Sequence, residues 1–212
     1  AWALGPGVAA GADDQLGRIA RALKWAKNER VPTVLDAGGF ALLPPPPDRL
    51  EPWIILTPHA GEMATLLTDR GIPTERSQVE EQPAYYARLA AELVGGTVLL
   101  KGPATVVAGQ DGALYVQADG VRWLATAGTG DVLTGLIGAL LAGHGNSVAI
   151  VPELPAQVAA LGAMVHGRAA KRAAQECGQM DQPAGPGGIG KPISAMDVVR
   201  ALPLTIAELL GR

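Results

Sequence analysis

The sequence predicts a three-layer α/β fold with a mainly parallel sheet. Short apolar, β-branched segments alternate with longer segments of helical periodicity, as in successive βαβ units. The short segments lack alternating polar residues, which indicates strands that are buried on both faces. The 212 residues include only four Trp, three Tyr and one Phe. The core must therefore consist mainly of small aliphatic side chains, which suits helices packed closely on a sheet.

The first quarter of the chain predicts a strand, a helix and a second strand. The segment 1–4 is strand-like and runs directly into Gly5-Pro6-Gly7. The segment 13–28 has acidic residues at its start, apolar residues at helical spacing and basic residues near its end, so its charges match the helix dipole. The β-branched segment 31–35 predicts the second strand.

The middle of the chain continues the alternation. A proline run at 44–47 is interpreted as a rigid surface loop rather than a recognition motif. Residues 53–56 then predict a third strand, after which Thr57-Pro58 begins a helix that extends to about residue 68. A further helix is expected at 83–94, followed by another buried strand at 97–100.

The last part of the chain predicts a hairpin and then mostly helix. Strands at 104–108 and 113–117 meet across Asp111-Gly112, a dipeptide typical of hairpin turns. From Asp131 onward the pattern is nearly all helix, with a Gly/Pro-rich loop at 178–192 and a last helix at 194–210. No linker divides the sequence, so residues 1–212 are expected to form a single domain.

The composition excludes several classes of function. The net charge is −3 with scattered charges, which disfavours nucleic acid or an anionic membrane as a partner. The single cysteine, Cys177, excludes an internal disulfide framework and a thiolate metal cluster, and fits a reducing cytoplasm. The uncharged segment 132–152 holds glycines and His144, so we interpret it as a buried helix and a loop rather than a membrane span. No signal peptide is visible, and cytoplasmic localisation is predicted.

The most informative motif is Gly128-Thr129-Gly130-Asp131, which stands at the start of a long apolar helix. Glycines allow the backbone to approach a ligand, and the free amides of a helix start favour an anion such as a phosphate. In isolation, Asp131 is also compatible with a plain role as a first-turn acid that complements the helix dipole. The surrounding pattern favours the functional interpretation.

Three more polar residues follow predicted strands, where ligands collect in parallel sheets. Asp36 ends one strand, His59 stands in Thr57-Pro58-His59-Ala60-Gly61-Glu62 after the next, and Lys101 begins Lys101-Gly102-Pro103-Ala104-Thr105. Each has an ordinary alternative. Asp36 is compatible with a turn aspartate, His59 with a surface residue at a helix start, and Lys101 with a solvent-facing hairpin lysine.

Two apparent signals are discounted. Gly185 to Lys191 has the spacing of a Walker A loop, but Pro192 replaces the Ser or Thr that would hold magnesium and no strand precedes it. The histidines at 59, 144 and 166 lack metal-ligand spacing, so no metal site formed by protein ligands is predicted.

Taken together and in this order, the turn at Gly5-Pro6-Gly7, the strand end at Asp36, the His59 segment, the Lys101 segment and the segment from Gly128 to Gly135 resemble the ADP-dependent NAD(P)H-hydrate dehydratase family. The last motif is shared with ribokinase-like small-molecule kinases generally, whereas the His59 segment joined to the Lys101 segment is more specific. The resemblance implies a ribokinase-like fold. It also implies repair of hydrated NADH or NADPH at the expense of ADP, with release of AMP and phosphate.

The resemblance also implies roles for individual residues. Asp131 would be the catalytic base, and the backbone of Gly128, Thr129 and Gly130 would form the anion hole. The hydrate would contact Gly7, His59 and Asp131. ADP would be held by Gly130 and by five consecutive residues: Lys101, Gly102, Pro103, Ala104 and Thr105. Mg²⁺ is expected on the phosphates.

This sequence departs from the family pattern at several positions. Ala60 replaces the proline usual after the histidine, Gly38 replaces a second acid after Asp36, and Pro103-Ala104 alters the usual Lys-Gly-Ala-Gly-Thr loop. Family members also carry a strand and helix before the Gly-Pro-Gly turn, so an N-terminal segment of the domain is expected to be missing here. The resemblance further implies a homo-oligomer and, in the parent chain, fusion to an NAD(P)H-hydrate epimerase domain.

Two other functions compete with the dehydratase. One is a kinase of the same fold that phosphorylates a vitamin precursor such as a hydroxymethyl-pyrimidine or a thiazole alcohol with ATP. The other is a non-catalytic nucleotide-binding module. Product analysis separates the first, because a kinase leaves a stable phosphoester, and replacement of Asp131 separates the second.

Overall fold

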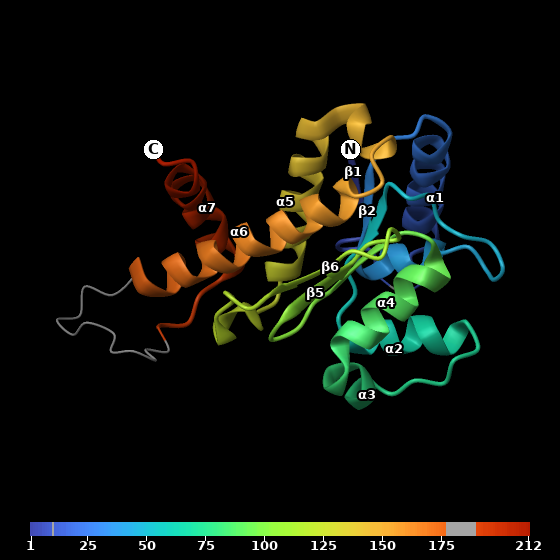
Figure 1. Ribbon diagram of the computed structural model, residues 1–212, viewed down its shortest axis with the longest axis horizontal. Coiled ribbons are helices and arrows are strands. Elements are labelled where there is room, and N and C mark those ends of the chain that lie inside the picture. Colours follow the sequence, from blue (N-terminus) through green and yellow to red (C-terminus); the bar gives the residue numbers. More distant parts are fainter. Residues whose placement is uncertain (10, 177–189) are drawn as a thin grey trace.

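The computed structural model describes residues 1–9, 11–176 and 190–212 (Figure 1). Cys177, the expected loop up to residue 189 and most of the Walker-like sequence lie outside the described residues. Within residues 1–9, 11–176 and 190–212, no helix is long and apolar enough to cross a membrane.

The sheet has six strands in the spatial order of the sequence, β1 to β6. The first four strands are parallel, and β4, β5 and β6 pair antiparallel as a terminal meander. Their bounds are β1 (Trp2–Leu4), β2 (Thr33–Leu35), β3 (Ile54–Leu56), β4 (Thr97–Leu100), β5 (Thr105–Ala108) and β6 (Leu114–Gln117).

Seven α-helices and three short 3-10 helices are described. The α-helices are α1 (Asp13–Asn28), α2 (Ala60–Asp69), α3 (Arg76–Glu81), α4 (Pro83–Val94), α5 (Thr129–His144), α6 (Leu154–Glu176) and α7 (Ala195–Leu209). The 3-10 helices are η1 (Ala37–Leu42), η2 (Arg122–Leu124) and η3 (Gly145–Ala149).

The helices cover both faces of the sheet. Figure 1 shows α5 and α6 on one side of the strands and α1, α2 and α4 on the other. The contacts agree: α5 packs on β1 and β2, and α6 packs on β3 to β6, whereas α1 packs on β1 and α4 on β4 and β5. The three-layer α/β fold with a mainly parallel sheet is therefore confirmed.

The core lies where the sequence is most apolar. Every residue of β2, β3 and β4 is buried, as expected for central strands covered by helices on both faces. Small residues such as Ala87, Ala90 and Ala91 of α4 are fully or almost fully buried, so this helix lies close to the sheet. The carboxyl end of α6 packs with α7 around a second, smaller apolar cluster.

Two differences from the sequence-based expectation are instructive. The helix expected to begin at Thr57 begins at Ala60 instead, because His59 has an extended backbone and is the N-cap. Helix α3 was not expected, because its six residues are mostly polar and only Val79 is buried. Its start is defined locally by a capping box between Glu75 and Gln78.

Candidate active site

The parallel strands bring three separate motifs to one edge of the sheet. Asp36 follows β2, His59 follows β3 and Lys101 follows β4, so the register of the strands places all three at the carboxyl ends. A further bridge joins His59 to Lys101, in which the Lys101 amide donates to the Pro58 carbonyl oxygen at 2.8 Å. This edge is where ligands bind in open α/β sheets.

Asp36 and Lys101 form an ion pair at this edge. Lys101 Nζ lies 2.8 Å from Asp36 Oδ1, and Asp36 is only 1% exposed. The hydroxyl of Thr134, on α5, donates to the other carboxylate oxygen, Oδ2, at 2.8 Å. Both oxygens of this buried carboxylate are therefore satisfied, as a buried charge requires.

Gly5 is required by the close approach of the β1 turn to Asp36. The φ of Gly5 is +113°, and a Cβ there would lie 1.9 Å from the Asp36 carbonyl oxygen. The Asp36 amide in turn donates to the Leu4 carbonyl oxygen at 3.1 Å. Gly7, the predicted hydrate contact, is exposed in the same turn, and a Cβ built there would have no neighbour within 4 Å. The Gly5-Pro6-Gly7 turn thus extends the edge formed by the strand ends.

The start of α5 faces the same ion pair. Gly128 is the N-cap, with a φ of +87°, and the Thr129 hydroxyl contacts the Leu124 and Thr126 carbonyl oxygens at 2.7 Å each. A Cβ on Gly130 would lie 3.5 Å from Lys101 Nζ. The first amides of a helix have no acceptor within the helix and carry its positive dipole end. The Thr129 amide donates to the Thr126 carbonyl oxygen at 3.3 Å, but the Lys101 ammonium lies beside Gly130 at this helix start, an arrangement that suits a phosphate.

His59 and Glu62 are locked together at the start of α2. His59 Nδ1 accepts from the Glu62 amide at 3.1 Å, and Glu62 Oε2 accepts from the His59 amide at 2.8 Å. Because Nδ1 is an acceptor, a neutral His59 carries its proton on Nε2. The ring remains 58% exposed and available to a ligand. Glu62 Oε2 also lies 4.0 Å from Lys101 Nζ, so the starts of α2 and α5 meet at Lys101.

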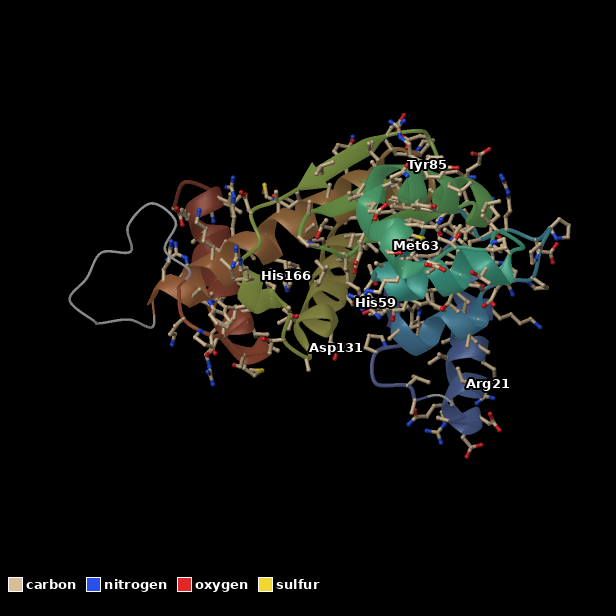
Figure 2. All side chains as sticks on the ribbon, turned by 90° about the horizontal axis from the view of Figure 1, so that it is seen from below. Arg21, His59, Met63, Tyr85, Asp131 and His166 are labelled. Atoms are coloured by element: carbon tan, nitrogen blue, oxygen red, sulfur yellow. The ribbon has the colours of Figure 1, made fainter. Side chains whose placement is uncertain are left out.

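Asp131 is exposed in the first turn of α5. Figure 2 labels Asp131 at the start of α5 and His59 at the start of α2. Lys101 lies near both helix starts. An exposed carboxylate is a side chain of the kind that can act as a general base.

The segment after Lys101 runs along the rim of the site. Gly102 and Pro103 are exposed, Ala104 is half-buried and Thr105 begins β5. The structure therefore brings Asp36, Lys101, Gly130 and Glu62 into contact or near contact, whereas the rest of this segment forms an open border.

The site offers few protein ligands for a metal ion. Among the side chains that the structure describes, no three His, Cys, Asp or Glu residues gather as a metal-binding group. Both oxygens of Asp36 are engaged, and Glu62 Oε2 is engaged by its cap. Glu62 Oε1 has no hydrogen bond to the described residues. Mg²⁺ commonly binds through one carboxylate and substrate phosphates, and this donor set fits that mode.

Two residues of structural importance were missed from the sequence. Thr134 had no assigned role, although it follows Gly130 by four residues and so shares its helix face. His166, on α6, is 7% exposed, and its Nε2 is buried with no partner among the described residues. Burial lowers the pKa of His166 to about 4. A hydrogen bond that the ring donates to the backbone of Thr129 raises the pKa, but this effect is smaller than that of burial. No sequence signal distinguishes this histidine from a surface residue.

The fold and the site together define a class of protein: an α/β protein with a cluster of polar and charged residues at the carboxyl ends of a parallel sheet. Comparison with known proteins makes this more specific. The family model described as NAD(P)H-hydrate dehydratase matches residues 1–184. The chain belongs to this family, and the resemblance stated from its motifs is confirmed.

Individual relatives agree with the family. The chain is 38% identical over 176 residues to an ADP-dependent (S)-NAD(P)H-hydrate dehydratase of Xanthomonas campestris, covering 82% of this chain and 54% of that protein. It is 43% identical over 146 residues to the bifunctional NAD(P)H-hydrate repair enzyme Nnr of Mycobacterium tuberculosis, covering 67% of this chain and 28% of that protein. The chain thus spans about half or less of the length of these relatives.

Solved structures show the same fold. An ADP/ATP-dependent NAD(P)H-hydrate dehydratase from Bacillus subtilis, co-crystallised with ATP and Mg²⁺, has a TM-score of 0.66 and 27% sequence identity, covering 97% of this chain and 63% of that chain. A hydroxyethylthiazole kinase from Pyrococcus horikoshii has a TM-score of 0.61 at 20% identity, covering 92% of this chain and 67% of that chain. The latter likeness shows the ribokinase-like fold alone.

Proposed function

We propose that this chain carries the ADP-dependent dehydration of hydrated NADH or NADPH. The observation that carries the proposal is the convergence of Lys101 Nζ with the amide end of α5, 3.5 Å from the Cβ position of Gly130. This arrangement supports binding of a terminal phosphate in a chain whose family relatives are named as ADP-dependent dehydratases.

ADP would bind with its phosphates between Lys101 and the anion hole formed by the backbone of Gly128, Thr129 and Gly130. The remaining nucleotide contacts would come from the rim, residues 102–105. Lys101 suits this role because only one protein acceptor, Asp36 Oδ1, lies within hydrogen-bond distance of its ammonium among the described residues. An ammonium has three donors, so two remain for phosphate oxygens.

The hydrate would bind at the exposed side of the site, where Gly7, His59 and Asp131 are accessible. The His59 Nε2–H, fixed by the cap on Nδ1, is a donor for a polar group of the hydrate. Asp131 would accept the proton of the hydrate hydroxyl as its oxygen attacks the terminal phosphorus of ADP and the bond to AMP breaks. The amides of the anion hole would stabilise the charge on the transferring group.

The transferred phosphoryl group converts hydroxide, a poor leaving group, into phosphate. Phosphate then leaves with the electron pair of the carbon–oxygen bond, the neighbouring carbon loses a proton, and the ring double bond is restored. Mg²⁺ would accompany the nucleotide, and Glu62 would supply a carboxylate oxygen to it. When bound, the ion would neutralise phosphate charge.

The decisive test gives the purified chain hydrated NADH with Mg²⁺ and either ADP or ATP. Recovery of the reduced nicotinamide absorbance and release of free phosphate are followed. Asp131→Asn should lower turnover by several powers of ten while sparing ADP binding. Asp14→Asn is the matched control, because Asp14 is also an exposed first-turn acid, on α1, and should leave turnover unchanged.

Each other outcome has a definite meaning. A stable phosphoester instead of free phosphate would identify a kinase. Full activity of the Asp131→Asn variant would refute the catalytic role of this carboxylate. ADP binding without recovery of absorbance would show that this chain lacks the activity, and a longer parent chain should then be assayed.

The wider setting of the activity is also proposed. Relatives named as bifunctional repair enzymes support fusion to an epimerase domain in the parent chain. Cytoplasmic localisation, a homo-oligomer, and the absence of nucleic-acid and membrane partners stay predictions from the sequence and the resemblance. Size-exclusion chromatography with light scattering tests the oligomer directly.

A further inference from the structure

Thr134 connects helix α5 to the Asp36–Lys101 ion pair. Its hydroxyl donates to Asp36 Oδ2, whereas Lys101 Nζ donates to Oδ1, each at 2.8 Å. Thr134 is fully buried at 0% exposure and Asp36 is 1% exposed, so little of this carboxylate is open to water. The two oxygens of Asp36 are therefore divided between a hydroxyl and an ammonium.

This division determines where the ammonium can lie. Because Thr134 already donates to Oδ2, that oxygen does not depend on Lys101 for a partner, and the ammonium lies on Oδ1, beside Gly130. Without the hydroxyl, Oδ2 would be a buried acceptor with no partner, which is costly. The flexible lysine side chain could then shift to serve both oxygens, and its position relative to the amides of α5 would change.

We propose that Thr134 is a positioning residue for the nucleotide phosphate. By occupying Oδ2 of Asp36 it holds the Lys101 ammonium on Oδ1, at the amide end of α5. The proposal rests on the proposed function insofar as the phosphate belongs to ADP. The positioning of the ammonium itself depends only on the contacts among Thr134, Asp36 and Lys101.

A purely structural role for Thr134 is the alternative to be separated. The same hydrogen bond joins α5 to the end of β2, so its loss should also lower stability. The two roles differ in their dependence on Lys101. A positioning role acts through the ammonium and should disappear when the ammonium is removed, whereas a structural role should not.

The experiment compares Thr134→Val, which removes the hydroxyl, with Thr134→Ser, which keeps it. Binding of Mg²⁺-ADP is measured by calorimetry, and kcat and KM are measured with the hydrate. Thr134→Val should weaken ADP binding and lower kcat/KM by about tenfold to a hundredfold, as expected for a displacement of about 1 Å. Thr134→Ser should restore most of both. If Thr134→Val does not fold, Thr134→Ala removes the same hydroxyl without adding a methyl group.

The matched control is Thr205→Val. Thr205 is 3% exposed on α7, and its hydroxyl donates to the Ala201 carbonyl oxygen of its own helix at 2.9 Å. The same chemical change is thus made at a buried threonine away from the ion pair. It should leave ADP binding unchanged, whatever its effect on stability.

A double-mutant cycle with Lys101→Met decides between the two roles. Thr134→Val should cause no further loss of ADP binding in the Lys101→Met background. Losses that multiply in the double variant, or equal effects of the valine and serine variants, would overturn the proposal.

The failure of the proposed function can be distinguished from the failure of this proposal. If the chain binds ADP but does not dehydrate the hydrate, the binding cycle still decides the role of Thr134. If it binds no ADP, crystal structures of this chain without substitution and of its Thr134→Val variant decide instead. A displaced Lys101 ammonium in the variant supports the proposal, and an unchanged position overturns it.

Discussion

His166 should make the stability of the fold depend on pH in a range where most side chains do not titrate. Its folded-state pKa is lowered by burial from the ordinary value of 6.5 to about 4. The unfolded chain therefore binds a proton at this site more readily than the folded chain. The contribution is fully present above about pH 6.5 and is lost as the pH falls toward 4.

The size of the effect follows from the two pKa values. A difference of about 2.5 units corresponds to a limiting loss of about 3 kcal/mol, because each unit is worth about 1.4 kcal/mol. Between about pH 7 and pH 5 the loss should reach about 2 kcal/mol. A typical domain has only about 5–15 kcal/mol of net stability, so this loss is large enough to measure.

Chemical denaturation at about pH 7 and pH 5 measures the effect. The wild type and His166→Gln are compared, because glutamine does not titrate and other groups titrate alike in both proteins. The pH-dependent loss should be about 2 kcal/mol smaller in the variant. Equal losses in the two proteins would refute the assignment of His166 as a buried, neutral histidine.

Three substitutions test other features of the site, and a fourth, Gly11→Ala, is the control for the first. Gly5→Ala should destabilise the fold by about 3 kcal/mol or more, because its methyl group would lie 1.9 Å from a backbone oxygen. Gly11 has a similarly positive φ of +78°, but a Cβ there would have no neighbour within 4 Å, so Gly11→Ala should cost only about 1 kcal/mol. Equal losses of unfolding free energy in the Gly5→Ala and Gly11→Ala variants would show that the structure relieves the clash at Gly5. Gly130→Ala should change stability by less than about 1 kcal/mol, since the atom nearest to the new methyl group lies at 3.5 Å. The methyl group would fill the proposed phosphate position, so ADP binding measured by calorimetry should weaken about tenfold. Unchanged binding would place the phosphate elsewhere. His59→Ala should lower the unfolding free energy by about 1 kcal/mol through loss of the cap on Glu62, and an unaltered midpoint of unfolding would argue that the cap contributes nothing.

The fold could be predicted from the sequence because its main signals are local. Apolar strands without alternation indicated a covered parallel sheet, and Asp111-Gly112 indicated the hairpin between β5 and β6, where Gly112 indeed has a φ of +87°. Helix α3 was missed because it depends on one buried side chain, Val79, and on reciprocal capping by Glu75. Neither leaves an apolar periodicity to detect.

The site was less predictable because its residues meet only through long-range contacts. Lys101 alone was compatible with a solvent-facing hairpin residue, and the pairing with Asp36 depends on the register of the parallel strands. His59 combines both of its possible roles, since it caps α2 and yet remains exposed. The burial of His166 depends on the packing of α6 with α5, which no local pattern specifies.

The proposed ligand binding explains the Asp36–Lys101 pair better than stability does. A buried ion pair often contributes no more to stability than apolar residues of similar volume, because desolvation offsets the attraction between the charges. Here the desolvation is one-sided: the Asp36 side chain is 2% exposed, but that of Lys101 is 22% exposed. The carboxylate is therefore committed to protein donors, while the ammonium makes one hydrogen bond to the described residues and stays partly exposed. Such asymmetry has little value for packing, yet it presents a fixed cation beside the free amides of α5, where an anionic ligand gains from both.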